Sequence, residues 1–326
     1  MRPGPELERW LADPGKHQAV ADRWDAYTLA MGRHPLIAGL KADLAALDDP
    51  APAAVLAVAE SFLDRTATIE ALIEDLIASA AADPFLRLPF MEVRTDVNFG
   101  LLLFENPLLQ ISIGVISVDA LAAKRSGRRG GASISFTGHT TAYQFVKGGG
   151  ATLSLWEAPA VAAGFRRDPG VRCRPAGTRH VRDGDRLILD GRRQSFAIEH
   201  ASSDIVHIQA AVRTGTAPFA VEYDAATLEL IGASSTDEAA SRLQMMVSML
   251  RILDRTDAAP LIAEALDSPH FHIRWHVMRE LLALDADLAH PHLLRMAVAD
   301  PHPEVRNAAR QTLEAFFAPE DEPCPA

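Results

Sequence analysis

The middle of the chain, from about residue 90 to residue 232, consists of short runs of β-branched and aromatic residues. Runs such as "LLQISIGVIS", "TAYQFVKGG" and "DIVHIQAAV" are separated by glycine, asparagine, proline and aspartate. This pattern predicts about ten β-strands joined by short connections. Such connections leave little room for crossover helices, so the strands should be antiparallel. The sequence therefore predicts a closed barrel or a two-sheet sandwich over residues 86–233.

Helical periodicity precedes this β segment. In the stretch "AAVLAVAESFLDRTATIEALIEDLIASAA" (53–81), apolar residues recur every three or four positions, as on an amphipathic helix. Pro50 and Pro52 come before the stretch, and Asp83-Pro84 follows it. Two shorter helices are expected upstream. Residues 1–85 are thus predicted to form an N-terminal helical region, in which we identify no functional site.

Helical periodicity also returns after the β segment, and there it repeats. The stretch "DSPHFHIRWHVMRELLAL" (267–284) aligns with "ADPHPEVRNAARQTLEAF" (299–316) at an offset of 32 or 33 residues. A further helical run, "HPHLLRMAVA", lies between them. The repeating unit is therefore a helix–turn–helix. Ser235 and Glu238 have the spacing of a capping box, which predicts a long helix that begins with Ser235 as N-cap.

These C-terminal units resemble HEAT-type repeats over residues 236–317. The resemblance rests on a turn with aspartate and proline that leads into Val305-Arg306 in one unit and Ile273-Arg274 in the other. It implies that the arginine and the aspartate brace neighbouring units. Stacked units leave a concave groove, so residues 234–318 could serve as a docking platform for a protein or peptide, or as a brace within the chain. Residues 319–326 are expected to form a disordered tail.

Basic side chains are concentrated in one part of the chain. Residues 120–215 contain 15 basic and 7 acidic side chains, although the whole chain has a net charge of −11. The acidic flanks argue against nucleic-acid binding, which requires a basic surface. The basic segment instead favours an anionic small molecule or an acidic partner, unless its arginines simply pair with acids of the same chain. Guanidinium groups suit carboxylate and phosphate, and the candidate ligand contacts are Arg179, Arg186, Arg192, Arg193 and the neighbouring Gln194.

The segment "DGDRLILDGRRQSFAIEHASSDIVHIQ" (183–209) contains a turn, a strand, a glycine turn and two more strands. In this order it resembles the second half of a cupin barrel, and the resemblance extends over residues 130–212. Gln194 stands where the family has a metal-binding histidine, and the proline of that corner is missing. The family's first-half His-x-His motif is also absent, with His139 as the nearest equivalent. The resemblance therefore implies a barrel whose usual metal ligands are degraded.

A second pattern in the same segment favours a metal site. If "FAIEH" and "DIVHIQ" form a hairpin around Ser202-Ser203, His200 and His207 become diagonal neighbours on one face. Their Cβ atoms would then be about 7 Å apart or less, within reach of one iron or zinc ion. The alternative is that both histidines are half-buried and hydrogen-bonded, or lie on the outer face. The candidates for a third ligand are His139, His180 and Gln194.

Other features bear on the location of the protein. The N-terminal sequence "MRPGPELERW" lacks the apolar core of a secretory signal, and no apolar run is long enough for a membrane span. Cys173 and Cys324 do not form a disulfide framework or a metal motif. We therefore expect a cytoplasmic protein that is not bound to a membrane.

Two functions follow from these patterns. The first is a non-catalytic binding protein, in which a cupin-like β domain takes an anionic ligand or acidic partner and the HEAT-type repeats hold a protein or peptide. The second is a metal-dependent enzyme of the cupin type, an oxygenase acting on a peptide or a small acid. The broken metal motifs favour the first. In either case the expected fold is α+β and multidomain, with N-terminal helices, a central antiparallel barrel or sandwich and C-terminal helical repeats.

Overall fold

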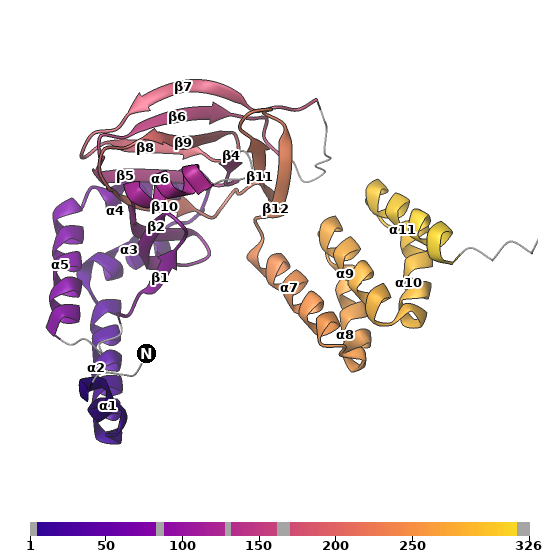
Figure 1. Ribbon diagram of the computed structural model, residues 1–326, viewed down its shortest axis with the longest axis horizontal. Coiled ribbons are helices and arrows are strands. Elements are labelled where there is room, and N and C mark those ends of the chain that lie inside the picture. Colours follow the sequence, from indigo (N-terminus) through magenta and orange to yellow (C-terminus); the bar gives the residue numbers. More distant parts are fainter. Residues whose placement is uncertain (1–4, 83–87, 128–131, 162–169, 318–326) are drawn as a thin grey trace, which may run out of the picture. The chain divides into compact units, whose positions relative to one another are not determined.

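The computed structural model describes residues 5–82, 88–127, 132–161 and 170–317 (Figure 1). The chain divides into two compact units, Met1–Ser234 and Ser235–Ala326. We call them unit 1 and unit 2 and describe each by itself. The tail predicted at residues 319–326 lies outside the described residues. Among the described helices, none combines the length and apolarity that crossing a membrane requires.

Unit 1 begins with helices, as predicted. Asp13 caps the second of them by accepting hydrogen bonds from the backbone N–H groups of Gly15 and Lys16. The stretch 53–81 forms two helices rather than one, with the break at Asp64-Arg65, and both bury their apolar faces in one core. The helices are α1 (Pro5–Leu11), α2 (Pro14–Gly32), α3 (Pro35–Ala45), α4 (Pro52–Leu63) and α5 (Thr66–Ala82).

The strands of unit 1 are short and antiparallel, in agreement with the sequence. The first group is β1 (Met91–Arg94), β2 (Asn98–Glu105), β3 (Leu109–Ile116), β4 (Ser133–Phe136), β5 (Thr140–Lys147) and β6 (Thr152–Glu157). The second group is β7 (Arg174–His180), β8 (Arg186–Asp190), β9 (Gln194–His200), β10 (Ile205–Val212), β11 (Phe219–Asp224) and β12 (Leu230–Ser235). Helix α6 (Val118–Gly127) follows β3.

These strands form three sheets with the orders β1-β2-β3-β10-β5-β8, β12-β11-β4 and β7-β6-β9. Within the described residues the sheets do not close into a barrel, and their arrangement is compatible with the predicted sandwich, with three sheets in place of two. Figure 1 shows β7 and β6 above β5 and β10.

The six-stranded sheet has two buried faces. On one face, Ile208, Ala210 and Val212 of β10 join the core of α3, α4 and α5. Side chains alternate along a strand, so the intervening residues of β10 face the three-stranded layer. There Ile205 packs with Phe145 and Leu153. The interior between the sheets is therefore a separate core from the one beneath the helices.

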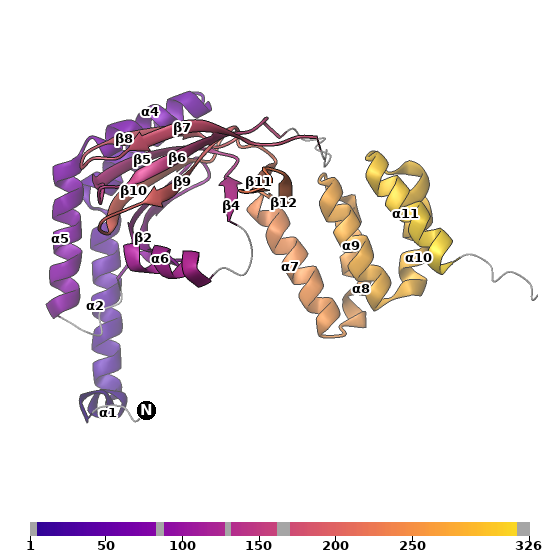
Figure 2. The same cartoon turned by 45° about the horizontal axis from the view of Figure 1, so that its top comes forward.

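Unit 2 consists of the helices expected from the repeat. They are α7 (Glu238–Ile252), α8 (Ala259–Glu264), α9 (Phe271–Leu284), α10 (Ala286–Ala299) and α11 (Pro303–Phe316), with 3₁₀ turns at Thr256–Ala258 and Ala265–Asp267. Figure 2 shows α7, α9 and α11 following one another along this unit. The predicted N-cap at Ser235 is wrong, because β12 extends to that residue and the helix begins later. Asp237 is the cap, and its carboxylate accepts from the backbone N–H of Ala240.

An arginine and an aspartate brace neighbouring repeats, as the HEAT resemblance implied. The Arg274 guanidinium donates to both carboxylate oxygens of Asp300, at 2.8 Å and 2.7 Å. Burial alone would raise the pKa of Asp300, but hydrogen bonds from Arg274 and from the backbone N–H of His302 hold it below its ordinary value. Arg274 also donates to the carbonyl oxygen of Ser268. This ion pair thus links the turn before α9 to the turn before α11.

Candidate functional site

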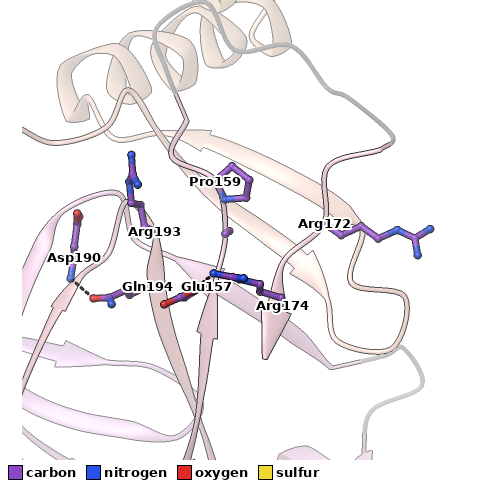
Figure 3. Close-up of a pocket in the computed structure, with 8 residues that line it drawn as sticks. Glu157, Pro159, Arg172, Arg174, Asp190, Arg193 and Gln194 are labelled. Atoms are coloured by element: carbon purple, nitrogen blue, oxygen red, sulfur yellow. Dashed lines mark hydrogen bonds and ion pairs between the residues drawn. The ribbon is translucent and has the colours of Figure 1, made fainter. Parts of the chain in front are cut away.

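The candidate site of unit 1 is a pocket of about 490 Å³ that we call the arginine pocket. It lies where β6 ends, where β7 begins and beside the turn that joins β8 to β9. Three of its side chains are guanidinium groups, and two are carboxylates. The lining residues are Glu157, Ala158, Pro159, Arg172, Arg174, Asp190, Arg193 and Gln194 (Figure 3).

The turn between β8 and β9 is held in place by backbone contacts. The N–H of Gly191 donates to the carbonyl oxygen of His139, and the N–H of Ala158 donates to that of Arg193. A Cβ atom at Gly191 would lie 2.3 Å from Thr137 Oγ1 and 2.4 Å from the His139 carbonyl oxygen. Only glycine therefore allows this close approach, which carries Arg193 to the pocket.

Most charges around the arginine pocket are already paired. Arg174 contacts Glu157 at 2.6 Å, and Arg172 contacts Glu229 at 2.7 Å. Figure 3 shows Arg174 reaching Glu157 while Arg172 extends away from the other labelled side chains. Arg193 differs, because no carboxylate among the described residues pairs with it. It is the lining guanidinium available to an incoming anion.

The negative charge of Asp190 is balanced by Arg192, which does not line the pocket. The Arg192 side chain donates to both oxygens of this carboxylate, at 2.7 Å and 2.9 Å. Hydrogen bonds from Arg192 lower the pKa of Asp190, and the nearby charge of Arg193 contributes to the same shift. The backbone N–H of Asp190 donates to the side-chain oxygen of Gln194. Asp190 is thus ionised at neutral pH, and the hydrogen bonds to its carboxylate come from Arg192 rather than from Arg193.

The five residues that the sequence suggested as ligand contacts lie in different places in the structure. Arg193 and Gln194 line the pocket, whereas Arg192 binds Asp190. Arg186 points toward the helices, where it pairs with Asp64 at 2.8 Å and donates to Gln144. Arg179 donates to the carbonyl oxygen of Arg186. These two arginines stabilise the fold away from the pocket.

Two pocket arginines were missed by the sequence reasoning. Arg172 and Arg174 are two positions apart just before and at the start of β7. Residues at this spacing share one face of an extended chain, so the run "RCRP" contained the signal. The sequence did not show which strand lies beside β7. That strand is β6, which precedes it in the chain.

A second, smaller cavity adjoins the arginine pocket. This inner cavity has a volume of about 150 Å³ and lies between β5 and β8 on one side and β4 and β9 on the other. Gln194 lines both spaces. Burial raises the pKa of Tyr143 in this cavity to about 12. The lining residues are Ser135, Thr137, Thr141, Tyr143, Leu189, Gly191, Gln194, Ser195 and Phe196.

The hairpin predicted for His200 and His207 is wrong. β9 pairs with β6, whereas β10 lies between β3 and β5 in the other sheet. The residues at the expected turn explain the difference: the N–H groups of Ser202 and Ser203 both donate to the carbonyl oxygen of Gly149. This contact directs the chain from one sheet to the other instead of folding it back on itself.

The four histidines suggested as metal ligands consequently have different environments. His200 is exposed at the end of β9, and His180 Nδ1 is 2.9 Å from Thr152 Oγ1. Burial lowers the pKa of His139. His207 is buried, which lowers its pKa to about 4, and its Nδ1 has no partner among the described residues.

These environments do not fit a shared metal ion. A neutral buried imidazole such as that of His207 suits a metal chemically. However, in the described parts of the chain no three His, Cys, Asp or Glu side chains gather closely enough to hold one. His200 is held in the other sheet, away from His207.

A comparison with family models agrees with the HEAT resemblance seen in the sequence. Residues 227–314 match the family model of HEAT repeats. HEAT-type units stack into surfaces that generally mediate protein interactions. No curated protein matches the chain.

Solved structures similar to the chain include cupin domains. The cupin domain of Schizosaccharomyces pombe Cnp3 is 8% identical, with a TM-score of 0.24, and the match covers 39% of this chain and 67% of that one. Ectoine synthase from P. lautus is 12% identical, with a TM-score of 0.23 and coverage of 45% and 85%. A cupin domain from Bordetella pertussis is 10% identical, with a TM-score of 0.22 and coverage of 37% and 97%.

Proposed function

We propose that this protein is a non-catalytic binding protein with two separate binding surfaces. The arginine pocket of unit 1 takes a small anionic ligand, and unit 2 docks a protein partner. The observation that carries the first part is Arg193, whose guanidinium lines the pocket without a carboxylate partner among the described residues. Guanidinium groups bind carboxylate and phosphate through paired hydrogen bonds.

The other polar groups of the pocket support an anion rather than a cation. Glu157 and Asp190 are each engaged by an arginine, so their charges are already balanced. The Gln194 side chain accepts a hydrogen bond from the Asp190 N–H through its oxygen, which leaves its amino group free to donate. A ligand in this pocket would therefore meet mainly N–H donors, as an anion requires.

Replacing Arg193 with glutamine should weaken anion binding by about tenfold, which corresponds to about 1.4 kcal/mol. The measurement is calorimetric titration with inorganic phosphate and with acetate at low ionic strength, because salt screens exposed charges. Arg182→Gln is the matched control, since it removes the same charge from an exposed turn that does not line the pocket. Equal affinities for the wild type and Arg193→Gln would contradict the proposal.

Helix α7 supports the second part of the proposal. Met245, Met249 and Ile252 are spaced as one helix face, and they are 62–70% exposed. Met246 adjoins this face and is 61% exposed. Methionine side chains are flexible and polarisable, which suits binding surfaces that adapt to a partner. The partner expected from this chemistry is a protein that presents the apolar face of an amphipathic helix.

The double variant Met245→Gln/Met249→Gln should lose this partner without losing stability, because both side chains are exposed. The wild-type chain and the double variant serve as baits, and the proteins they retain are compared by quantitative mass spectrometry. Leu261→Gln is the control bait, since Leu261 is 65% exposed on another helix, α8. A protein retained by the wild type and the control but lost from the double variant is the expected result. The retained protein must then bind the purified wild-type chain directly, and this binding must also be lost with the double variant. Identical retention by all three baits would refute the docking surface.

The alternative function, a metal-dependent oxygenase of the cupin type, has lost its main support. It rested on a hairpin between His200 and His207, and those residues lie on strands of different sheets. No arrangement among the described residues favours it over binding. The proposal retains the cytoplasmic location expected from the sequence, whose two cysteines form no disulfide framework.

A further inference from the structure

The inner cavity contains a polar group that the fold leaves without a partner. Thr141 is 2% exposed, and its Oγ1 has no hydrogen-bond partner among the described residues. Leaving a buried hydroxyl unsatisfied costs free energy, so native proteins rarely do so without a reason. Two other hydroxyls in the cavity are already used: Ser195 donates to the carbonyl oxygen of Ser135, and Thr137 donates to that of His139.

The character of the cavity is polar but uncharged. None of the described residues that line it carries a charge, whereas hydroxyl groups come from β4, β5 and β9. A cavity of about 150 Å³ can hold roughly six non-hydrogen atoms, since benzene fills an apolar cavity of that size. A group that fits is therefore small and neutral, and the unpartnered Thr141 hydroxyl would be its hydrogen-bond partner.

The inner cavity and the arginine pocket share one lining residue. Gln194 lines both, and its side-chain oxygen is fixed on the backbone of Asp190. Arg193, the residue before it, lines the outer space only, whereas Ser195, the residue after it, lines the inner space only. One molecule could thus place an anionic group near Arg193 and a neutral group near Thr141.

We propose that the ligand is a small hydroxylated anion, a polyol phosphate or a hydroxy acid, whose hydroxyl group is recognised by Thr141 in the inner cavity. This inference rests on the proposed anion-binding function and narrows its ligand class. Arg193 supplies affinity for the anionic end, and Thr141 supplies the preference for a hydroxylated body over an alkyl one. A site built to bond a hydroxyl discriminates strongly against a ligand that lacks it.

The test compares ligands matched in charge and size. Glycerol 3-phosphate is titrated against n-propyl phosphate, and glycerate against butyrate, by calorimetry with wild-type protein. We expect the hydroxylated member of at least one pair to bind about tenfold more tightly, and the pair that shows this identifies the anionic group. Thr141→Val should abolish the preference, whereas Arg193→Gln should weaken both members of the pair and leave their ratio unchanged.

The outcomes separate the two proposals. Binding that depends on Arg193 but shows no preference in either pair overturns the hydroxyl site and leaves the anion pocket standing. A preference that survives in Thr141→Val also overturns the site. If no anion binds in a manner that depends on Arg193, the proposed function fails, and the ligand class fails with it.

A measurement without ligand checks the same residue independently. Valine has the shape of threonine but no hydroxyl, so Thr141→Val removes a buried group that lacks a partner. The melting temperature of unit 1 should therefore rise by roughly 2–4 °C. Differential scanning calorimetry of the ligand-free chain measures this. A fall would mean that the hydroxyl is already hydrogen-bonded in the free protein, which would remove the basis of the inference.

Discussion

Replacing Asp300 with alanine is expected to destabilise unit 2 by about 3–5 kcal/mol, because it leaves the buried Arg274 guanidinium without its counter-charge. The side chains of Arg274 and Asp300 are 9% and 3% exposed, and two hydrogen bonds join them. The remaining bonds from Arg274 to the carbonyl oxygens of Ser268 and Pro269 do not neutralise its charge.

Urea unfolding of unit 2 is followed by fluorescence in chains in which Trp10, Trp24 and Trp156 are replaced by phenylalanine, so that the remaining indole is that of Trp275 in α9. Asp287→Ala serves as control: this aspartate is exposed in the first turn of α10, and its loss should change the unfolding free energy by about 0.5 kcal/mol or less. The double variant Arg274→Met/Asp300→Leu should recover most of the loss, because it removes both charges. A loss below about 1 kcal/mol in Asp300→Ala would show that the pair does not brace the repeats.

Acidification is expected to destabilise unit 1 through His207. Burial lowers the pKa of this histidine to about 4, from 6.5 when it is exposed. The unfolded chain therefore binds a proton below pH 6.5 that the folded chain does not bind until about pH 4. The destabilisation is absent above pH 6.5, grows as the pH falls and is complete below about pH 4. Between pH 7.5 and pH 5 it should amount to about 2 kcal/mol.

The comparison that isolates this effect is His207→Gln, which cannot titrate. Its unfolding free energy should depend less on pH than that of the wild type, by about 2 kcal/mol over the same interval. Hydrogen exchange of the β10 amides follows the folded state of this sheet directly. His200→Gln, at the exposed end of β9, is measured beside it as the matched His-to-Gln substitution outside the core. Equal slopes for the wild type and His207→Gln would mean that His207 takes up its proton over the same pH range in the folded protein as in the unfolded chain.

The HEAT-type repeats were readable from the sequence because their interactions are local. The turn, the helix that follows it and the bracing pair all lie within one unit or its neighbour, and Arg274 and Asp300 are 26 positions apart. The strand positions were readable for the same reason, since alternation and turn residues act over a few residues. The error at Ser235 has a local cause too, because β12 occupies that residue.

The predicted metal site failed at a step that is not local. β9 pairs with β6 and β10 with β3 and β5, and the residues between β9 and β10 donate to the carbonyl oxygen of Gly149, which lies about 50 residues earlier. The sequence placed both histidines on strands correctly, but strand pairing decides which faces meet. For the same reason, the prediction that Arg186 contacts a ligand missed its real partner. Arg186 pairs with Asp64, which lies 122 positions away at the end of α4.

The sequence by itself therefore determined the order of helical, β and helical segments, the antiparallel strands and the HEAT-type unit, since each follows from a period or a turn within a short window. The tertiary structure alone decided how the strands pair into three sheets, that Arg172 and Arg174 join Arg193 at one pocket, and that Thr141 is buried without a partner among the described residues. These features depend on which distant strands become neighbours. That choice is made by the burial of whole faces and by long-range backbone contacts, which no short stretch of residues encodes.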